Sequence, residues 1–220
     1  MITRYSREEM ASIWELDKKF QYYLDVELAV IKAQVELGNF DEEVYENIKK
    51  TAKFDVKRID EIERVTRHDV IAFLENVNEN VGRKFSPYIH KGLTSSDVID
   101  TAFALQIKDS SKIINKDLDE LIEVVKELAF KHKNTVCLGR SHGIGAEVIT
   151  FGFKLLNLLD MLKRSKDRFN YVLDDVLVGQ ISGPVGTYSN IDPAVEEIKN
   201  LDEESIELLI KISKKFNTSI

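Results

Sequence analysis

Residues 97–131, DVIDTAFALQIKDSSKIINKDLDELIEVVKELAFK, decide the fold of this chain. Along this stretch apolar residues recur at steps that mostly alternate between four and three: Val98, Ala102, Leu105, Ile114, Leu118, Leu121, Val125 and Leu128. This spacing is that of the seam of a helix in a coiled-coil-like bundle. An uninterrupted helix of this length would extend about 50 Å. The stretch therefore predicts one unusually long helix that begins near Thr94 to Asp97.

A second long stretch, residues 146–178, predicts a partner for this helix. Its apolar residues fall on one broad face: Phe151, Leu155, Leu158, Leu159, Leu162, Phe169, Val172, Leu173 and Val176. Two such helices cannot cover each other's apolar faces completely. We therefore expect the rest of the bundle to come from other sequence or other subunits, and the protein to be an oligomer.

The first 93 residues predict shorter helices. Apolar spacing indicates one helix from Ser6 to Gly38, followed by pieces at 41–51, 56–65 and 69–81. Proline, which breaks helices, occurs only three times in the chain. We predict an all-α protein, with a small N-terminal helical domain (1–93) and part of a long-helix bundle (94–220).

The composition limits the classes of function. A net charge of −7 argues against general binding to nucleic acid, which needs clustered basic residues. The single cysteine, Cys137, cannot form an internal disulfide. The sequence contains no apolar stretch of about 18 residues, so it predicts no membrane helix. A cytoplasmic protein that binds neither nucleic acid nor a membrane is expected.

Two polar segments stand at predicted helix starts. Thr66-Arg67-His68-Asp69-Val70 places a guanidinium, an imidazole and a carboxylate in sequence, which suits an anionic ligand. The alternative is that Asp69 only caps the helix while Arg67 and His68 are exposed. His90-Lys91-Gly92-Leu93-Thr94-Ser95-Ser96-Asp97 supplies more hydroxyls than one cap needs, so it predicts a carboxylate or phosphate site.

Two further polar segments follow the long helices. Gly139-Arg140-Ser141-His142-Gly143-Ile144-Gly145-Ala146-Glu147 is predicted as a break between the helices, and it places Arg140 and His142 beside permissive backbone. Gly179-Gln180-Ile181-Ser182-Gly183-Pro184-Val185-Gly186-Thr187 is rich in small residues that let backbone approach a ligand. No phosphate loop and no Cys or His pair with metal-ligand spacing is present in the sequence.

At these four segments, in order over about residues 1–193, the sequence resembles the adenylosuccinate lyase family of the fumarase/aspartase superfamily. Arg4-Tyr5-Ser6 is similar to the family's segment for the substrate phosphate, and residues 66–70 and 90–97 are similar to its Arg-His-Asp and His-x-Gly-Leu-Thr-Ser-x-Asp motifs. Residues 139–147 resemble Gly-Arg-Thr-His-Gly-x-His-Ala-Glu-Pro, and residues 182–187 resemble Ser-Gly-Ala-Val-Gly-Thr.

The resemblance implies a β-elimination in purine biosynthesis that releases fumarate from adenylosuccinate, giving AMP, and from succinylaminoimidazole carboxamide ribotide. It implies no cofactor or metal, and a homotetramer whose sites are shared between subunits. The family's general acid corresponds to His142. The resemblance gives His68 both a catalytic and a substrate-binding role, and it implies substrate binding by Arg4, Tyr5, Arg67, Asp69, His90, Thr94 and Ser95.

The sequence also departs from the family pattern. Gly145 stands where the family usually has a second His, and Val148 where it has Pro. The family's Ser-Ser-x-Met-Pro-x-Lys-x-Asn loop, which bears the catalytic base, is absent from these 220 residues, so the chain is expected to be truncated and inactive alone. Two alternatives remain: another superfamily lyase, such as argininosuccinate lyase or fumarase, and a non-catalytic helical oligomerisation scaffold.

Overall fold

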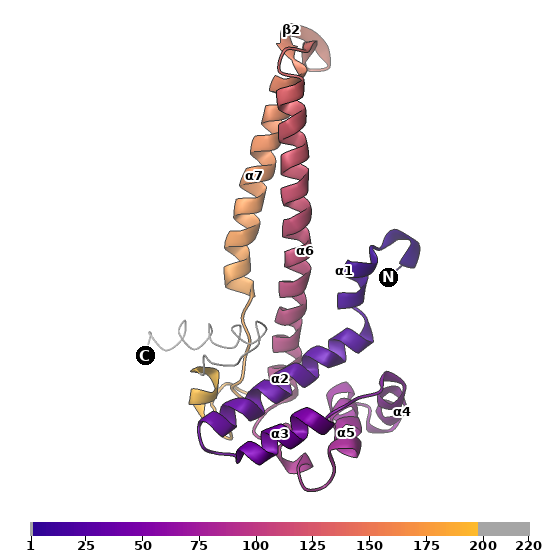
Figure 1. The fold of residues 1–220 in the computed structure, drawn as a ribbon, viewed down its shortest axis with the longest axis vertical. Helices are drawn as coiled ribbons and strands as arrows, with labels where there is room; N and C mark the ends of the chain where they lie inside the picture. Colours follow the sequence, from indigo (N-terminus) through magenta and orange to yellow (C-terminus); the bar gives the residue numbers. More distant parts are fainter. Residues whose placement is uncertain (1, 198–220) are drawn as a thin grey trace. The chain divides into compact units, whose positions relative to one another are not determined.

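A computed structural model describes residues 2–197 of the chain, and these are mostly helical (Figure 1). The α-helices are α1 (Glu8–Ile13), α2 (Leu16–Glu36), α3 (Glu42–Thr51), α4 (Val56–Thr66), α5 (Asp69–Val81), α6 (Ser95–Lys131) and α7 (Phe151–Val176). The strands β1 (Val136–Ser141) and β2 (Ile144–Thr150) pair, and the short 3-10 helices are η1 (Thr3–Tyr5), η2 (Ser86–Tyr88) and η3 (Pro193–Glu197). The predicted all-α class is confirmed.

The chain forms two compact units. Among the described residues, unit 1 comprises residues 2–109 and 177–197, and unit 2 comprises Ser110–Val176. Both boundaries lie at or within long helices, because α6 contributes its first part to unit 1 and its remainder to unit 2. The division at residue 93 that the sequence suggested stays a prediction. The prediction that the longest helix begins near residues 94–97 is confirmed, since α6 starts at Ser95 and has 37 residues.

An aromatic cluster forms the core of unit 1 between α2 and α5. The rings of Phe20 and Phe73 are stacked with centroids 5.7 Å apart, and Tyr23 meets both rings edge-on. Phe73 is fully buried, and Phe20 and Tyr23 are nearly so. Aromatic pairs of this geometry add to the stabilisation from burial itself. The cluster holds α5, and with it the end of the first polar motif (Asp69 and Val70), in a fixed place against α2.

The single helix predicted from Ser6 to Gly38 is wrong, because the structure has two helices that break at Trp14 and Glu15. The carbonyl of Ile13, at the end of α1, accepts a hydrogen bond of 2.9 Å from the buried side-chain amide of Gln106. This bond satisfies a carbonyl that a continuing helix would have used. The partner lies 93 positions along the chain, so local apolar spacing could not reveal the break.

In unit 2 the remainder of α6 lies side by side with α7 (Figure 1). Ile122, Val125 and Leu159 form a buried cluster between the two helices, with Leu155 and Leu162 packed against it. An ion pair between Asp119 and Lys166 joins the same two helices. The predicted pairing of two long amphipathic helices is therefore present, with α7 shorter than expected.

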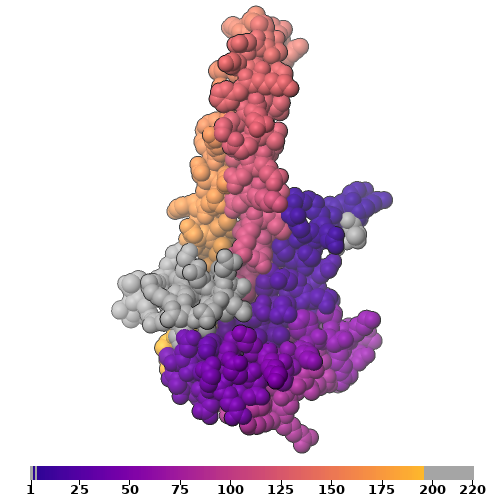
Figure 2. Space-filling model, viewed as in Figure 1, coloured from indigo at the N-terminus to yellow at the C-terminus, as the bar shows by residue number. Residues whose placement is uncertain are grey.

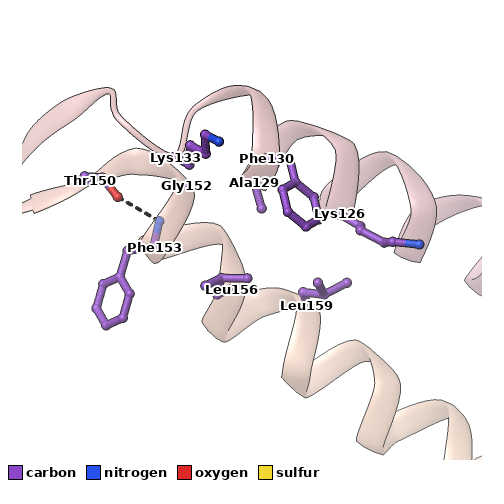
Figure 3. A pocket seen from close by; sticks show the side chains of 9 residues that line it. All are labelled: Lys126, Ala129, Phe130, Lys133, Thr150, Gly152, Phe153, Leu156 and Leu159. Atoms are coloured by element: carbon purple, nitrogen blue, oxygen red, sulfur yellow. Dashed lines mark hydrogen bonds between the residues drawn. The ribbon is translucent and has the colours of Figure 1, made fainter.

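The helix predicted to start at Ala146 begins only at Phe151, because residues 144–150 form strand β2 instead. β2 pairs antiparallel with β1, and its β-branched residues Val148, Ile149 and Thr150 favour a pleated strand. Thr150 then caps α7, since its hydroxyl accepts a bond of 3.1 Å from the Phe153 backbone N–H (Figure 3). The predicted polar break between the helices is thus a β-hairpin.

Much of the predicted seam in unit 2 is not covered by the described residues of this chain. Leu121 is 46% exposed, and Leu128 and Ile114 are more than one-third exposed. Figure 2 shows unit 2 as a narrow column made of the remainder of α6 and of α7, with the hairpin at its end. An apolar pocket of about 290 Å³ opens on this unit, lined by residues that include Phe130, Phe153 and Leu156 (Figure 3).

Candidate active site

The junction between α4 and α5 places the first polar motif at two helix ends. Arg67 ends α4 in the left-handed conformation, with φ 56°, and its backbone N–H donates to the Glu63 carbonyl. His68 is the N-cap of α5, and its Nδ1 accepts from the Ile71 backbone N–H at 3.5 Å. The alternative that Asp69 is the cap is therefore wrong. The side chains of Arg67 and His68 are both exposed, so a ligand can reach them.

Asp69, the first residue of α5, is held from two sides. One carboxylate oxygen accepts from its neighbour's backbone N–H at 2.8 Å, and the other lies 3.5 Å from the ammonium of Lys19. Burial lowers the pKa of Lys19, but the Tyr23 phenol and the Asp69 carboxylate outweigh burial and raise it above the ordinary value. A cation on α2 thus offsets the charge of Asp69 beside Arg67 and His68.

The structure brings the first two motifs together at His68 and Ser95. The imidazole Nε2 of His68 lies 3.4 Å from the hydroxyl oxygen of Ser95, the first residue of α6. The N-terminal ends of α5 and α6 therefore meet at this contact. Each helix N-terminus carries partial positive charge and free backbone N–H groups, so their meeting point favours an anion. Thr94, the residue before α6, is half-buried beside it.

His90 belongs to the same motif but is held by a residue that the sequence reasoning missed. The buried carboxylate of Glu27 accepts from the His90 backbone N–H at 2.8 Å, and its second oxygen lies 2.6 Å from the ring Nδ1. His90 itself has φ 60°, which is uncommon for a residue other than glycine. Glu27 falls on the apolar face of α2, between Leu24 and Ile31, and a charged residue at such a position was the available signal.

Asp97 joins the second motif to the fourth. Its fully buried carboxylate accepts from the backbone N–H groups of Thr94 at 2.9 Å, Ser182 at 3.1 Å and Gly183 at 3.1 and 3.2 Å. The first of these bonds is the return half of a capping box at the start of α6. The other bonds anchor the segment that follows α7. Asp97 therefore fixes backbone around the site.

A second connection lies one turn further along α6. The Thr101 hydroxyl donates to the Gln180 carbonyl at 3.2 Å and accepts from the Gln180 backbone N–H at 3.0 Å. Thr101 is 1% exposed, so this reciprocal pair is shielded from water. Together with Asp97 it fixes residues 180–183 against the first part of α6. The start of α6 and residues 180–183 are about 80 positions apart in the chain. The sequence pattern therefore gives no sign that the two segments are neighbours.

His142, the predicted general acid, lies at the tip of the hairpin in unit 2. Ser141 pairs with Ile144, so His142 and Gly143 form a two-residue turn with φ values of 53° and 76°. Positive φ at both central positions is the signature of a type I′ turn, which suits a hairpin. The His142 side chain is exposed. His68, Ser95 and His90 belong to unit 1.

Arg4 and Tyr5 form a pair of their own at η1. The guanidinium carbon of Arg4 lies 4.8 Å from the centroid of the Tyr5 ring, and both side chains are exposed. This is the geometry of a cation–π contact. An exposed arginine that rests on an aromatic ring still presents its N–H groups to an anion, as the predicted phosphate role requires.

Two glycines of the third motif, Gly139 and Gly145, lie close to other atoms of the hairpin. A Cβ on Gly139 would lie 2.7 Å from the Glu147 carbonyl oxygen, at the point where the register of the hairpin shifts. A Cβ on Gly145 would lie 2.9 Å from a methyl group of Leu138. The histidine that the family usually has at the position of Gly145 would therefore need Leu138 to move.

The part of the chain that the structure describes contains no group of three or more His, Cys, Asp or Glu residues placed to hold a metal ion. None of its helices is long and apolar enough to cross a membrane.

The helical fold and the polar motifs at its helix ends identify the class of protein. A model of a family described as "Lyase" matches residues 3–215, and the chain belongs to this family. The folds of two solved structures agree with the assignment. A fumarate lyase from Mesorhizobium has a TM-score of 0.81 at 23% identity, over 96% of this chain and 48% of that one. A β-carboxy-cis,cis-muconate cycloisomerase from Acinetobacter calcoaceticus has a TM-score of 0.80 at 25% identity, over 93% and 48%.

Three similar sequences are adenylosuccinate lyases. The enzyme of Synechocystis is 54% identical over 198 residues, and those of Aquifex aeolicus and Bacillus subtilis are each 46% identical over 201 and 197 residues. Each match covers 90% of this chain and 46% of the relative. The resemblance to adenylosuccinate lyase is thus confirmed, and the chain spans less than half the length of these relatives.

Proposed function

We propose that this chain supplies part of the active site of an adenylosuccinate lyase, which eliminates fumarate from adenylosuccinate and from succinylaminoimidazole carboxamide ribotide. The observation that carries the proposal is the contact between His68 and Ser95, where two helix N-termini meet. The exposed residue Arg67 directly precedes His68 in the chain. This arrangement can bind the phosphate or carboxylates of such a substrate. We call a protein of the relatives' length that contains this chain the full-length lyase.

The reaction needs a base and an acid. A base removes the proton next to a carboxylate of the succinyl group, and the electron pair of that C–H bond forms the fumarate double bond as the C–N bond breaks. The departing nitrogen takes a proton from an acid, a role that we give to His142, because an imidazole can hold and release a proton near neutral pH. We give the role of the base to none of the 220 residues. His68 assists catalysis by contacting the substrate.

The binding roles follow from position. Thr94 and Ser95 offer hydroxyl and backbone donors for a substrate carboxylate at the start of α6, and His90 lies a few residues before them. Arg4, Tyr5 and Arg67 are exposed, and in this proposal they bind the phosphate, while Asp69 is a further substrate-binding residue. The proposed reaction uses no cofactor or metal ion.

We also propose that the full-length lyase is a cytoplasmic homotetramer. Each active site is then shared between subunits. The tetramer is supported by the exposed apolar residues of unit 2, among them Leu121 and Phe130, which is 68% exposed. Burial of a large apolar side chain is worth about 1.5–3 kcal/mol, so several such residues favour association. Sedimentation of the full-length lyase should give a tetramer, and a stable monomer would contradict this proposal.

The exposed apolar faces also favour a second candidate, a non-catalytic helical scaffold. A scaffold need not bind nucleotide. Another superfamily lyase, such as argininosuccinate lyase or fumarase, would act on a substrate without the phosphate that Arg4, Tyr5 and Arg67 are proposed to bind.

A titration separates these candidates. The full-length lyase is titrated with adenylosuccinate and, in parallel, with argininosuccinate and fumarate. The proposal predicts saturable binding of adenylosuccinate at concentrations where the other two compounds do not bind. Preference for argininosuccinate or fumarate would indicate the other lyases, and no binding of any compound would favour the scaffold.

A further inference from the structure

Glu27 makes two hydrogen bonds to the same distant residue. One carboxylate oxygen accepts from the backbone N–H of His90 at 2.8 Å, and the other lies 2.6 Å from Nδ1 of the His90 ring. The side chain of Glu27 is 2% exposed and that of His90 is 18% exposed. Both carboxylate oxygens are therefore used on a single residue 63 positions further along the chain.

A carboxylate is a costly residue to bury, and it is retained here with two matched donors. The backbone bond helps to hold His90 at φ 60°, a conformation that costs free energy for a residue with a side chain. The backbone bond alone could be made equally well by the oxygen of an amide. The bond to the ring is different, because a carboxylate can only accept, and Nδ1 must then carry a proton.

We propose that Glu27 is the positioning residue of His90: it keeps the proton of the neutral ring on Nδ1 and leaves Nε2 as the nitrogen that faces the substrate. The hydrogen bond made by one ring nitrogen determines the state of the other. In this tautomer Nε2 accepts a hydrogen bond from the substrate, and on protonation it becomes a donor. The proposal rests on the proposed function only in that His90 contacts the substrate.

Glu27→Gln tests this proposal with almost no change of volume. The amide oxygen can keep the bond from the backbone N–H of His90, and the amide nitrogen then faces Nδ1 and donates to it. The ring must respond by moving its proton to Nε2. The matched control is Glu36→Gln, the same change at an exposed position of the same helix.

The first readout is spectroscopic and does not need turnover. The protein is labelled with 15N in its four histidines, and the His90 resonances are assigned from their loss in His90→Ala. At alkaline pH, where an ordinary histidine ring is neutral, wild type and Glu36→Gln should show Nδ1 protonated, and Glu27→Gln should show Nε2 protonated. An unchanged tautomer in a folded Glu27→Gln variant would overturn the proposal.

A second variant covers the case in which Glu27→Gln does not fold. Glu27→Asp keeps the carboxylate but withdraws it by one methylene group. It should retain the proton on Nδ1, although the bond is longer. A ring that loses this preference while a carboxylate is still present would also overturn the proposal.

Kinetics in the full-length lyase separate this inference from the proposed function. Glu27→Gln should lower kcat/KM for adenylosuccinate by about 10- to 100-fold, as when the partner that orients a metal-bound histidine is removed, and Glu36→Gln should change it little. Turnover that stays normal while the tautomer reverses would overturn the role of Glu27. Absence of turnover in the wild type would instead contradict the proposed function and leave the spectroscopic result standing.

Discussion

Asp97 and Gly183 are joined through both oxygens of the Asp97 carboxylate, which accept from the Gly183 backbone N–H at 3.1 and 3.2 Å. Asp97 is fully buried at the start of α6, and Gly183 follows α7 with φ 80°. The same carboxylate also binds the backbone of Ser182 and Thr94. One side chain thus holds together two segments of unit 1 that the sequence could only describe separately.

Asp97→Asn should destabilise the protein by about 2–4 kcal/mol. The amide group keeps one acceptor oxygen, but its NH2 group faces backbone N–H groups that then lack a partner, and hydrogen bonds to charged groups are worth about 1.5–3 kcal/mol each. Denaturant unfolding measures the loss. Asp100→Asn, an exposed change one turn away, should stay within about 0.5 kcal/mol of wild type. Equal stability of the two variants would show that Asp97 does not fix this backbone.

Arg67→Asn should weaken binding of adenylosuccinate to the full-length lyase by about tenfold or more. Asparagine tolerates the left-handed conformation that Arg67 adopts, so the variant removes the guanidinium while preserving the end of α4. A charge-assisted hydrogen bond is worth roughly 1.5–3 kcal/mol, which sets the size of the effect. Calorimetric titration measures it.

The control for this prediction is Arg64→Asn, which removes an arginine of the same helix that pairs with Asp60 and is exposed. It should leave substrate affinity unchanged. Equal substrate affinity in both variants and in wild type would show that Arg67 does not bind the substrate.

Stability should fall as pH rises above about 10, and Tyr22 should contribute to the fall. Burial, reinforced by the hydrogen bond to Asp109, raises the pKa of Tyr22 above its ordinary value of 10.0. The unfolded chain therefore loses this proton before the folded chain does, and folding becomes less favourable by up to about 1.4 kcal/mol per pH unit for one proton. The contribution of Tyr22 to the free energy of unfolding is constant below pH 10 and is lost as the pH rises above 10.

Unfolding midpoints measured between pH 9 and about 11 test this prediction. The Tyr22→Phe variant removes the titrating group, so its stability should decline less steeply with pH than that of wild type. Tyr171→Phe, at a side chain that is 76% exposed, should follow the wild-type slope. Identical slopes for all three proteins would contradict the assigned role of Tyr22.

The sequence predicted the helices well where the pattern is local. The start of α6 is marked by Ser and Asp residues, and α5 has the predicted limits 69–81 because Gly82 ends it. The errors arose where a distant partner decides, as Gln106 does for the break after Ile13. The hairpin carries local signals in His142-Gly143 and in the β-branched residues Val148 and Ile149. The apolar spacing of residues 146–150 continues that of α7, so it predicts a helix where the chain forms a strand.

The candidate site was predictable to a lesser degree. The motifs identified exposed residues such as Arg67 and His68, but they could not show that His68 meets Ser95 or that Glu27 holds His90. These contacts depend on the packing of α2, α5 and α6, and side chains at helix ends carry no periodicity that reveals their partners. Asp97 belongs to the second motif, and its contacts with residues 182 and 183 appear only in the fold.

Fumarate release by the full-length lyase is the measurement that tests the proposed role of His142 as the general acid. Wild type and His142→Ala are compared at saturating adenylosuccinate. General acid catalysis contributes about 10²- to 10⁴-fold, so kcat should fall by about that factor while substrate binding stays close to that of wild type. A near-normal kcat in His142→Ala, with loss of turnover in His68→Ala or His90→Ala instead, would contradict the assignment.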